Sequence, residues 1–469
     1  MNKFSKMKIL FIAYDNESFL TSFSLGIAYL ASVLRGKGCD VSIYSQDVYH
    51  LPEEHLITYL KTNHFDLVGV GVIGGYYQYR KLLKISQAIN SIPNRRFFYV
   101  IGGHGPSPEP EFFLRRTGAD AVVIGEGEVV MGNLVDTLGS GGNLSGVKGL
   151  AYWDGDKVRV NDRERLIEDV NSIPFPAWDL FPMDYYTMMR APQIRLTERS
   201  QMVFTGRGCP FKCNFCYRMD PGFRPRSSEN ILEELSILKR DYHVTFFEFQ
   251  DDLFMISEKR AIEFCEKLIK ADLNIRFTCN GRLNYATREV LRTLKKAGCA
   301  FINYGIEALD DTVLENMNKK LTVEQIIKGI ENTIAENLHP GLNIIWGNIG
   351  DNAETLRKGV EFIIKYTTYA QLRTIRPVTP YPGSPLYYYA IEKGLLEGPE
   401  DFYEIKHVNS DLFTVNFTEH SDEECYQLMY EANKRLINNY IDHEKQSYME
   451  QIRKLYQEKD TSFRGFRHT

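Results

Sequence analysis

Three cysteines on one short segment constrain this chain more than any other feature of its sequence. Cys209, Cys213 and Cys216 have a Cys-x3-Cys-x2-Cys spacing within residues 207–217. Thiolates are soft ligands that hold iron–sulfur clusters, and three of them leave one iron of a [4Fe–4S] cube without a protein ligand. A catalytic metal site needs such an open position, whereas a structural site is closed.

A zinc knuckle and three unrelated thiols are the alternative interpretations. A zinc site needs a fourth Cys or His nearby, and none follows Cys216 for many residues. Eight cysteines in 469 residues do not predict a disulfide scaffold, so we expect a reducing cytoplasm. The five remaining thiols are interpreted as buried apolar residues; they are Cys39, Cys265, Cys279, Cys299 and Cys425.

Length and charge limit the function classes. A chain of 469 residues is expected to form two or three domains. The net charge of -5 gives no basic surface for nucleic acid. No apolar run is long enough to cross a bilayer, so we expect no membrane-spanning segment. The first residues lack the apolar core of a signal peptide, so we expect none.

The first third predicts a doubly wound parallel α/β sheet, because short apolar runs alternate with helical patterns. Strands are expected at 8–14, 41–44, 67–72, 97–101 and 121–124. Ligands bind such sheets at the carboxyl ends of the strands. Glycines stand at these ends, where a ligand can approach the backbone; they are Gly102, Gly103, Gly125 and Gly127.

A proline-rich connector at 171–182 leads into repeated strand–helix units. Strands are expected at 202–205, 244–249, 275–279, 301–304, 342–347 and 371–375. Six such units predict a partial (β/α)6 barrel with its catalytic groups at the carboxyl ends of the strands. Two amphipathic helices, at 421–440 and 442–456, are expected to follow. We expect the first α/β domain at 1–165, a linker at 166–198, the barrel at 199–395 and a C-terminal helical region at 396–469.

Polar and aromatic side chains gather at the predicted rim of this barrel. Arg282 suits a carboxylate, which a guanidinium binds through two hydrogen bonds. For each polar group the alternative is a strand-end residue that caps the next helix. The candidates are Phe215, Tyr217, Asp252, Asn280, Arg282 and Glu307.

The cysteine spacing resembles that of the radical S-adenosylmethionine (SAM) superfamily. The segments 24–31, 102–104 and 125–128 resemble the cobalamin-binding domain that precedes many radical SAM barrels, over residues 7 to about 150. The segments 305–307 and 379–387 resemble the cobalamin-linked radical SAM family, and with them the resemblance covers residues 7 to about 395. It implies a [4Fe–4S] cluster, SAM and cobalamin as cofactors. It places Phe215 and Tyr217 near adenine, Asp252 at the SAM ammonium or the substrate, and Glu307 at the ribose.

For the cobalamin domain, the resemblance implies contacts from the glycine-ended strands and the first helix. The Asp-x-His-x-x-Gly motif that supplies a lower axial histidine is absent, because the only Asp-x-His, at 241–243, lacks the glycine. His104 is either a cofactor contact or a turn histidine. The expected contacts are Ser24, Leu25, Gly102, Gly103, His104, Gly125, Glu126 and Gly127.

The resemblance implies a methyltransferase that acts on an unactivated carbon of a small molecule or natural-product intermediate. One SAM would methylate cobalamin, and a second would yield a 5'-deoxyadenosyl radical. An electron donor such as flavodoxin or ferredoxin is implied as a partner. The alternatives are a relative that catalyses oxidation, cyclisation or ring contraction, and a non-catalytic corrinoid or iron–sulfur binding protein.

Overall fold

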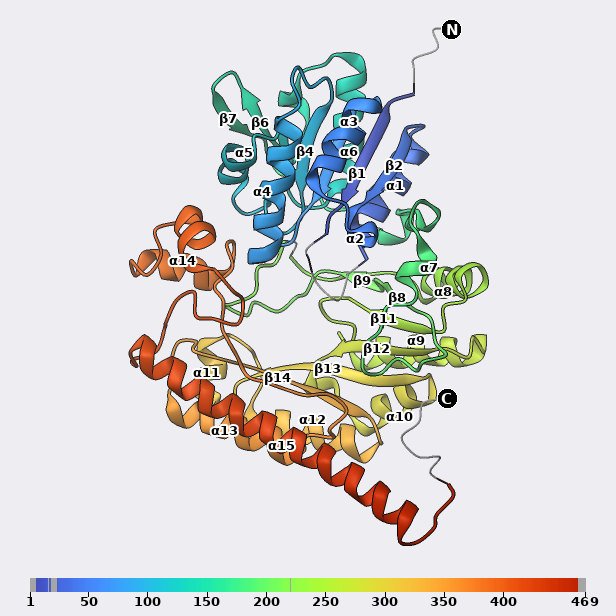
Figure 1. Cartoon of the computed structure of the whole chain (residues 1–469), viewed down its shortest axis with the longest axis vertical. Coiled ribbons are helices and arrows are strands. Elements are labelled where there is room, and N and C mark those ends of the chain that lie inside the picture. The colour runs from blue at the N-terminus through green and yellow to red at the C-terminus, as the bar shows by residue number, and fades with distance from the viewer. Residues whose placement is uncertain (1–5, 16, 18–22, 220, 463–469) are drawn as a thin grey trace.

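The computed structural model describes residues 6–15, 17, 23–219 and 221–462, and it contains two α/β units joined by a connector (Figure 1). The first unit is built on a seven-stranded sheet and the second on a six-stranded sheet. None of the described helices is long and apolar enough to cross a membrane.

The first sheet has the topology that the sequence predicts. Its strands are β1 (Lys8–Ala13), β2 (Asp40–Ser45), β3 (Leu67–Gly71), β4 (Phe98–Gly102), β5 (Ala121–Val123), β6 (Leu150–Asp154) and β7 (Lys157–Val160). The order is β2-β1-β3-β4-β5-β6-β7, with β1 to β5 parallel and β6 and β7 added as an antiparallel hairpin. The five predicted strands are confirmed, whereas the hairpin was not predicted. In such a sheet, ligands bind where the connections switch direction, here between β1 and β3.

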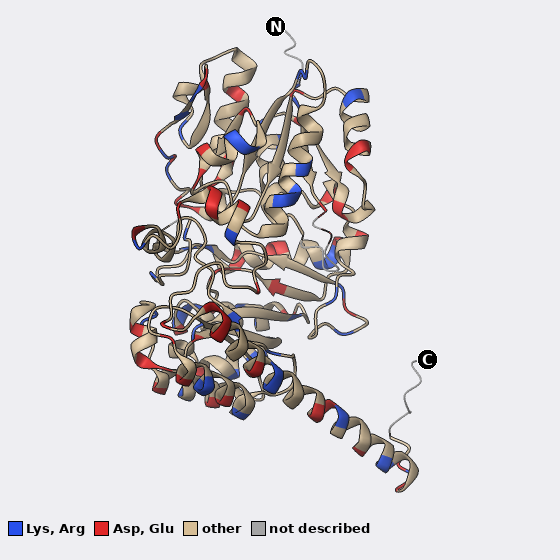
Figure 2. Cartoon of the chain, turned by 60° about the vertical axis from the view of Figure 1, so that its left-hand side comes forward, with Lys and Arg blue, Asp and Glu red and all other residues tan. Residues whose placement is uncertain are grey.

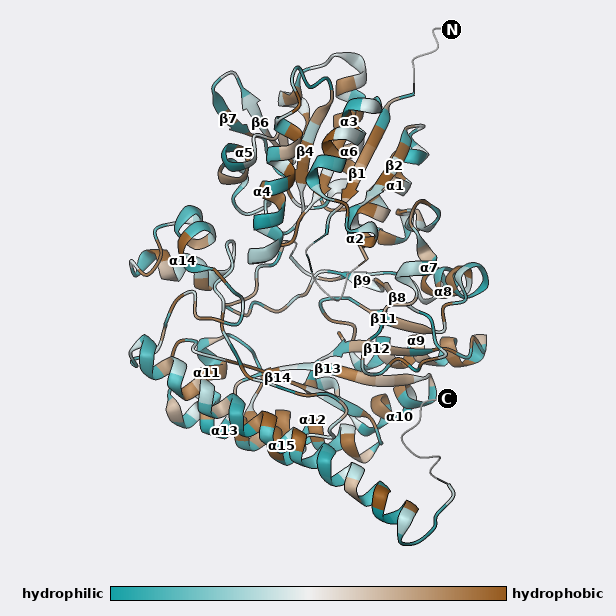
Figure 3. Ribbon diagram, in the orientation of Figure 1, coloured by the Kyte–Doolittle hydropathy of each residue, from teal (hydrophilic) through white to brown (hydrophobic). Residues whose placement is uncertain are grey.

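Helices cover both faces of this sheet because alternate side chains of β1 point to opposite sides. Ile9 and Phe11 pack with α1 and α6, whereas Leu10 and Ile12 pack with α3, α4 and α5 in a second core. Figure 3 shows the hydrophobic residues concentrated on the strands. The helices are α1 (Leu25–Gly36), α2 (Gln46–Tyr49), α3 (Glu53–Thr62), α4 (Tyr76–Asn90), α5 (Pro110–Thr117) and α6 (Gly127–Ser140).

The connector packs against the first unit. Trp178 stacks on Phe23 with ring centroids 5.1 Å apart, and Phe181 lies 4.7 Å from the same ring. The Ala177 N–H donates to the carbonyl of Ala28 at 3.0 Å. Single 3₁₀ turns at Val170–Ser172 and Trp178–Leu180 interrupt its extended path before α7 (Met183–Tyr186). The proline-rich segment is therefore part of the interface between the two units.

The second sheet is the predicted partial barrel. Its strands are β8 (Ser200–Val203), β11 (Phe246–Phe249), β12 (Arg276–Gly281), β13 (Cys299–Glu307), β14 (His339–Trp346) and β15 (Arg376–Pro377), in the parallel order β15-β14-β13-β12-β11-β8. Helices cover its outer face; they are α8 (Ser228–Tyr242), α9 (Glu258–Ala271), α10 (Arg288–Lys296), α11 (Asp311–Asn316), α12 (Val323–Ala335) and α13 (Ala353–Tyr366). A capping box at Thr322 opens α12.

The sixth strand was predicted at 371–375, and this position is wrong. The backbone of Ile375 is paired by the side chain of Asn433, which accepts from its N–H at 2.8 Å and donates to its carbonyl at 3.0 Å. The main chain therefore joins β14 only at β15, from Arg376 onwards.

The two helices predicted near the C-terminus form one continuous helix, α15 (Asp422–Tyr456), because no Gly or Pro interrupts it and a capping box at Ser421 opens it. Its buried residues all lie between Cys425 and Leu436, where it packs on the barrel. The remainder projects from the molecule, as Figure 2 shows, and carries charges of both signs.

The segment between β15 and α15 returns to the first unit. It contains α14 (Pro385–Glu392), and Tyr403 beyond it packs 4.8 Å from the ring of Tyr79. Glu404 accepts hydrogen bonds from the Tyr79 hydroxyl and, at 2.6 Å, from Arg116. This segment ties the end of the barrel to α4 and α5 of the first unit.

Candidate functional site

The carboxyl ends of the two sheets face each other, and the cysteine loop lies between them. His104, after β4, meets the ring of Tyr217 edge-on at 5.9 Å. The Ser107 hydroxyl lies 3.8 Å from the sulfur of Met219. Gly383 completes the contact at φ +89, where a Cβ would overlap the Tyr217 ring. Both halves of the predicted site are thus brought together.

The cysteine loop runs between β9 (Gly206–Arg207) and β10 (Arg224–Pro225), and the barrel positions it. The Asn214 N–H donates to the carbonyl of Met317 at 2.9 Å, and the Asn318 side chain donates to the carbonyl of Lys212 at 2.7 Å. Both barrel partners belong to the turn after α11. Three free thiols lie on the loop: Cys209 half-buried, Cys213 buried and Cys216 exposed.

Neighbouring groups favour a thiolate at the buried cysteine. A hydrogen bond from the Cys216 thiol lowers the pKa of Cys213 to about 6, against the effect of burial, and the charges of Lys319 and Arg282 act in the same direction as the bond. The same contact raises the pKa of Cys216. The thiolate is the form that binds metal.

The donor set fits an iron–sulfur cluster better than a single ion. Among residues 6–15, 17, 23–219 and 221–462, no group of three His, Cys, Asp or Glu side chains converges to hold one metal ion. A [4Fe–4S] cube takes each thiolate on a different iron, so its three ligands need not converge on one point. Lys319 and Arg282 also suit an iron–sulfur cluster, because its thiolate ligands make the cluster anionic.

Glu307 occupies a strained position beside the loop. It ends β13 in a bulge and has φ +69, in the left-handed region that favours glycine. Its carboxylate accepts a hydrogen bond from Lys319 at 2.7 Å, and both side chains are about nine-tenths buried. Strain of this kind costs about 1–3 kcal/mol and is concentrated at functional sites. The predicted contact with the SAM ribose remains a prediction.

Arg282 holds the cysteine loop. Its guanidinium lies 3.6 Å from the centre of the Phe211 ring and donates to the carbonyls of Lys319 and Lys320, the latter at 2.8 Å. It therefore links the loop to the same turn that supplies Lys319. Binding of a carboxylate by Arg282 remains a prediction.

The other predicted barrel residues lie around this centre. Asn280 donates to the carbonyl of Asp251 at 2.8 Å. Burial lowers the pKa of His104, and the charge of the exposed Asp252 partly opposes this effect. Phe215 is partly buried and packs on the main core.

A buried cluster of four charges joins the first unit to the start of the cysteine loop. Arg207 pairs with Glu126 at 2.9 Å and with Glu128 at 2.5 Å, and Arg224 pairs with Glu126 at 2.7 Å. The two arginines outweigh the effect of burial and lower the pKa of Glu126. We call these four residues the interdomain charge cluster. The carboxylate of Glu126 is engaged in this cluster, and its contact with cobalamin remains a prediction.

The glycines predicted to bind cobalamin on the first sheet differ in backbone conformation and in the space beside them. Gly103 has φ +103, and a Cβ there would lie 2.5 Å from the carbonyl oxygen of Val72, so the fold alone requires it. Gly102 and Gly127 are close to Val123 and Leu30, whereas Gly125, at φ +83, has open space beside it. Of the residues predicted at α1, Ser24 precedes the helix and Leu25 is buried in the core.

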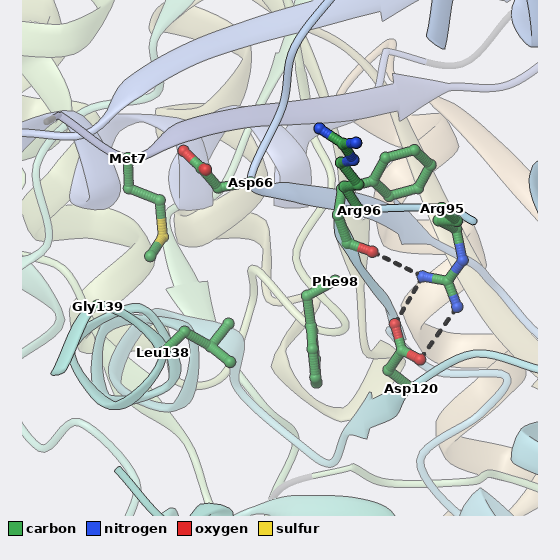
Figure 4. Close-up of a pocket in the computed structure, with 9 residues that line it drawn as sticks. Met7, Asp66, Arg95, Arg96, Phe98, Asp120, Leu138 and Gly139 are labelled. Atoms are coloured by element: carbon green, nitrogen blue, oxygen red, sulfur yellow. Dashed lines mark hydrogen bonds and ion pairs between the residues drawn. The ribbon is translucent and has the colours of Figure 1, made fainter. Parts of the chain in front are cut away.

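A cavity of about 740 Å³ lies at the opposite, amino-terminal edge of the first sheet (Figure 4). Met7, Asp66 and Phe98 line it from the strand starts, and Arg95 is bound to Asp120 at 2.7 Å. The strands of the sheet separate it from the cysteine loop, so it is not part of the candidate site.

Comparison with known proteins gives two family matches. The Radical SAM superfamily matches residues 203–363, and the B12 binding domain matches residues 16–135. An uncharacterised methyltransferase of Pyrococcus horikoshii is 35% identical over 402 residues, which cover 83% of this chain and 84% of that protein. The anaerobic magnesium-protoporphyrin IX monomethyl ester cyclase of Rubrivivax gelatinosus is 30% identical over 77% of this chain and 65% of its own length.

Two solved structures share the fold. The radical SAM methyltransferase TsrM of Kitasatospora setae, with cobalamin and a [4Fe–4S] cluster bound, superposes with a TM-score of 0.66 at 17% identity, over 83% of this chain and 75% of its own. The cobalamin-dependent radical SAM enzyme OxsB superposes with a TM-score of 0.72 at 19% identity, over 90% of this chain and 66% of its own.

Sequence reasoning missed the residues that hold the site together. Arg207 directly precedes the cysteine motif, and this adjacency was the available signal. Its partners Glu126 and Glu128 lie 81 and 79 positions earlier in the chain, and no local sequence pattern indicates such a pairing. Lys319, which pairs with Glu307 12 positions earlier, was also missed.

The first prediction tests where cobalamin lies. Gly26 is exposed in the first turn of α1, and a Cβ there meets nothing within 4 Å. If cobalamin covers this turn, Gly26→Val should weaken cobalamin binding at least about tenfold, or 1.4 kcal/mol, without lowering the melting temperature. Spectrophotometric titration and thermal unfolding measure the two. Unchanged affinity would place cobalamin elsewhere, and Gly26→Ala is the smaller control.

The second prediction concerns the interdomain charge cluster. Arg207→Met removes one partner of a buried ion pair and should lower the free energy of unfolding by about 3–5 kcal/mol, measured by denaturant titration. Adding Glu128→Gln should recover part of this loss, because the orphaned carboxylate is then neutral. The exposed Arg240→Met is the control and should change stability by less than about 0.5 kcal/mol. Equal effects of the two arginine variants would contradict the assignment.

Proposed function

This chain belongs to the cobalamin-binding enzymes of the radical SAM superfamily, and from that premise we propose that it transfers a methyl group from SAM to an unactivated carbon of a small molecule. It is a radical SAM enzyme with methyltransferase homologues, and its cofactors are a [4Fe–4S] cluster, SAM and cobalamin. When bound, these groups supply a carbon-centred radical and a transferable methyl group, and the protein supplies position and a protected site.

One observation carries the proposal: the cysteine loop is fixed opposite the carboxyl edge of the first sheet. Methyl transfer to carbon requires the substrate to lie between the source of the radical and the source of the methyl group. The His104–Tyr217 contact and the interdomain charge cluster hold the two sides of such a space at a set separation. Fixed geometry of this kind supplies much of the rate of a multi-centre reaction.

In this proposal the described residues have separate roles. Cys209, Cys213 and Cys216 hold the cluster. Glu307 binds the ribose of SAM, with Lys319 orienting its carboxylate at 2.7 Å. Asp252 is exposed and makes no hydrogen bond or ion pair with any residue in the described part of the chain, so it is available to the ammonium group of SAM or to the substrate.

Further parts of the proposal concern the setting of the enzyme. The eight free thiols support a reducing cytoplasm. A small one-electron donor of the flavodoxin or ferredoxin type would reduce the cluster, since SAM cleavage requires an electron from outside this chain.

The similarity to the anaerobic cyclase supports a second candidate, a reaction that uses the same cofactors without methyl transfer. The two differ in their products. A methyltransferase forms S-adenosylhomocysteine and 5'-deoxyadenosine in equal amounts with product, whereas a cyclase forms 5'-deoxyadenosine alone. A non-catalytic binding protein forms neither.

The third prediction tests the proposal directly. The reconstituted enzyme, a chemical reductant and SAM with a deuterated methyl group are incubated with a small-molecule extract of anaerobically grown cells. Mass spectrometry should find a new product that carries the intact labelled methyl group, together with both SAM-derived products. Release of 5'-deoxyadenosine without S-adenosylhomocysteine would favour the cyclase-type reaction instead.

The fourth prediction concerns the cluster ligands. Replacing Cys209, Cys213 or Cys216 by Ala should abolish reductive SAM cleavage, because a cube needs all three thiolates and the loop offers no substitute. Iron analysis, the visible spectrum and 5'-deoxyadenosine formation are measured for each variant. The buried Cys265→Ala, on α9 at the outer face of the barrel, is the matched control and should keep the cluster. A normal cluster in all three loop variants would sink the assignment.

A further inference from the structure

The inner face of the barrel sheet carries a group of polar side chains, whereas its outer face is apolar. In parallel pairs, residues in register share a face. Glu248, Thr278, Asn280, Asn303 and Asn343 alternate with buried residues and are half-exposed on the side away from the helices. The alternate positions, such as Tyr304, are buried; its hydroxyl lies 3.0 Å from that of Thr333 in α12. The inner face is therefore an accessible surface rather than a packed core.

A ladder of side-chain amides crosses this face. The Asn303 side chain donates to Asn280 at 3.2 Å and accepts from Asn343 at 2.8 Å, so the ladder spans β12, β13 and β14. Asn280 stands two residues before Arg282, which contacts the cysteine loop. The ladder thus leads from the cluster side of the barrel across the inner face.

Arg373 ends the ladder. It donates to the Asn343 oxygen at 2.8 Å, and its guanidinium lies 5.4 Å from the centre of the Phe301 ring. Gly341 leaves the room it needs, because a Cβ there would come within 2.8 Å of the guanidinium and 2.5 Å of the Asn303 oxygen. The fold has made space for this cation on the inner face.

No carboxylate neutralises this arginine within the described part of the chain. No ion pair within 4.0 Å involves Arg373, whereas its neighbour Arg376 is exposed and pairs with Asp411 at 3.1 Å. The acid that shares the face, Glu248, is on β11, two strands and so roughly 10 Å from the Phe301 position on β13. Burial lowers the pKa of Arg373 to about 10, and the charge of Arg376 adds to this effect.

We propose that Arg373 and the amide ladder form the substrate-anchoring site, and that the substrate carries a carboxylate or phosphate group which Arg373 binds. A half-buried cation without a counter-charge costs stability, and an anionic ligand removes that cost. The planar guanidinium binds both groups through paired hydrogen bonds, and the amides orient polar groups nearer the cluster. This inference rests on the proposed function for the identity of the ligand as substrate, but the anion site itself does not.

The test measures anion binding and stability of the reconstituted holoenzyme, without turnover. Inorganic phosphate and acetate are the probes, with chloride at matched ionic strength as the reference. We expect at least one probe to raise the melting temperature of the wild type above the chloride value and Arg373→Met to lose that rise. Arg376→Met is the matched control and should retain it. A response to phosphate alone indicates a phosphate ligand, a response to acetate alone indicates a carboxylate ligand, and a response to both shows that the site accepts either group.

Stability in chloride provides the second measurement. Arg226 is a buried arginine with a counter-charge, because it pairs with Glu234 at 2.5 Å, and Arg226→Met should lower the melting temperature. Arg373→Met should lower it much less, since the removed charge had no carboxylate partner and only the hydrogen bond to Asn343 and the contact with the Phe301 ring are lost. A fall comparable to that of Arg226→Met would show a structural arginine and overturn the proposal.

Four further outcomes separate the proposal from its alternatives. An equal response of the wild type and Arg373→Met to both probes would overturn the proposal, as would no response of the wild type to either. Loss of SAM binding in Arg373→Met, measured by equilibrium dialysis, would place the guanidinium against SAM instead of the substrate. Failure of methyl transfer with an intact anion response would contradict the proposed function alone.

Discussion

The interdomain charge cluster is the interaction on which the rest of the site depends. Arg207 stands two residues before Cys209, the first cysteine of the iron–sulfur motif. Its guanidinium pairs with Glu126 and Glu128 at the start of α6. Burying such charges costs several kcal/mol per ion, so an apolar contact would stabilise the interface at least as well. Directional pairs instead fix one relative position. The cluster therefore explains why the cysteine loop lies opposite the first sheet.

The two sheets offer different surfaces for ligand binding because their faces differ. The first sheet is apolar on both faces, since helices cover each, and it presents chemistry only at its carboxyl edge. Helices cover the barrel sheet only outside, and its inner face carries the amide ladder, with Arg373 at the end of the ladder. A ligand above the edge of the first sheet and one inside the barrel would meet at the cysteine loop. The position of the loop between β9 and β10 follows from this arrangement.

The features that the sequence predicts are local ones. Apolar runs predicted five strands of the first sheet, and the cysteine spacing predicted one loop. Pairing between distant residues left no such signal: Arg207 and Glu126 are 81 positions apart, and Asn303 and Asn343 are 40 apart. The sixth barrel strand was misplaced because the Asn433 side chain, 58 positions away, takes the hydrogen bonds of Ile375. The site is therefore predictable as a set of elements but not as a network.

Three separated contacts join the units, and together they bear on how the enzyme positions its substrate. They are the interdomain charge cluster, the connector packed on Phe23, and the returning segment in which Glu404 binds Arg116. A single contact would leave a hinge, whereas three contacts at different points oppose rotation about any one axis. Distances across the site are then set by packing and not by domain closure. Selection among substrates falls to side chains that face the space between the units, and within it the charge of Arg373 is the feature that most restricts what can bind.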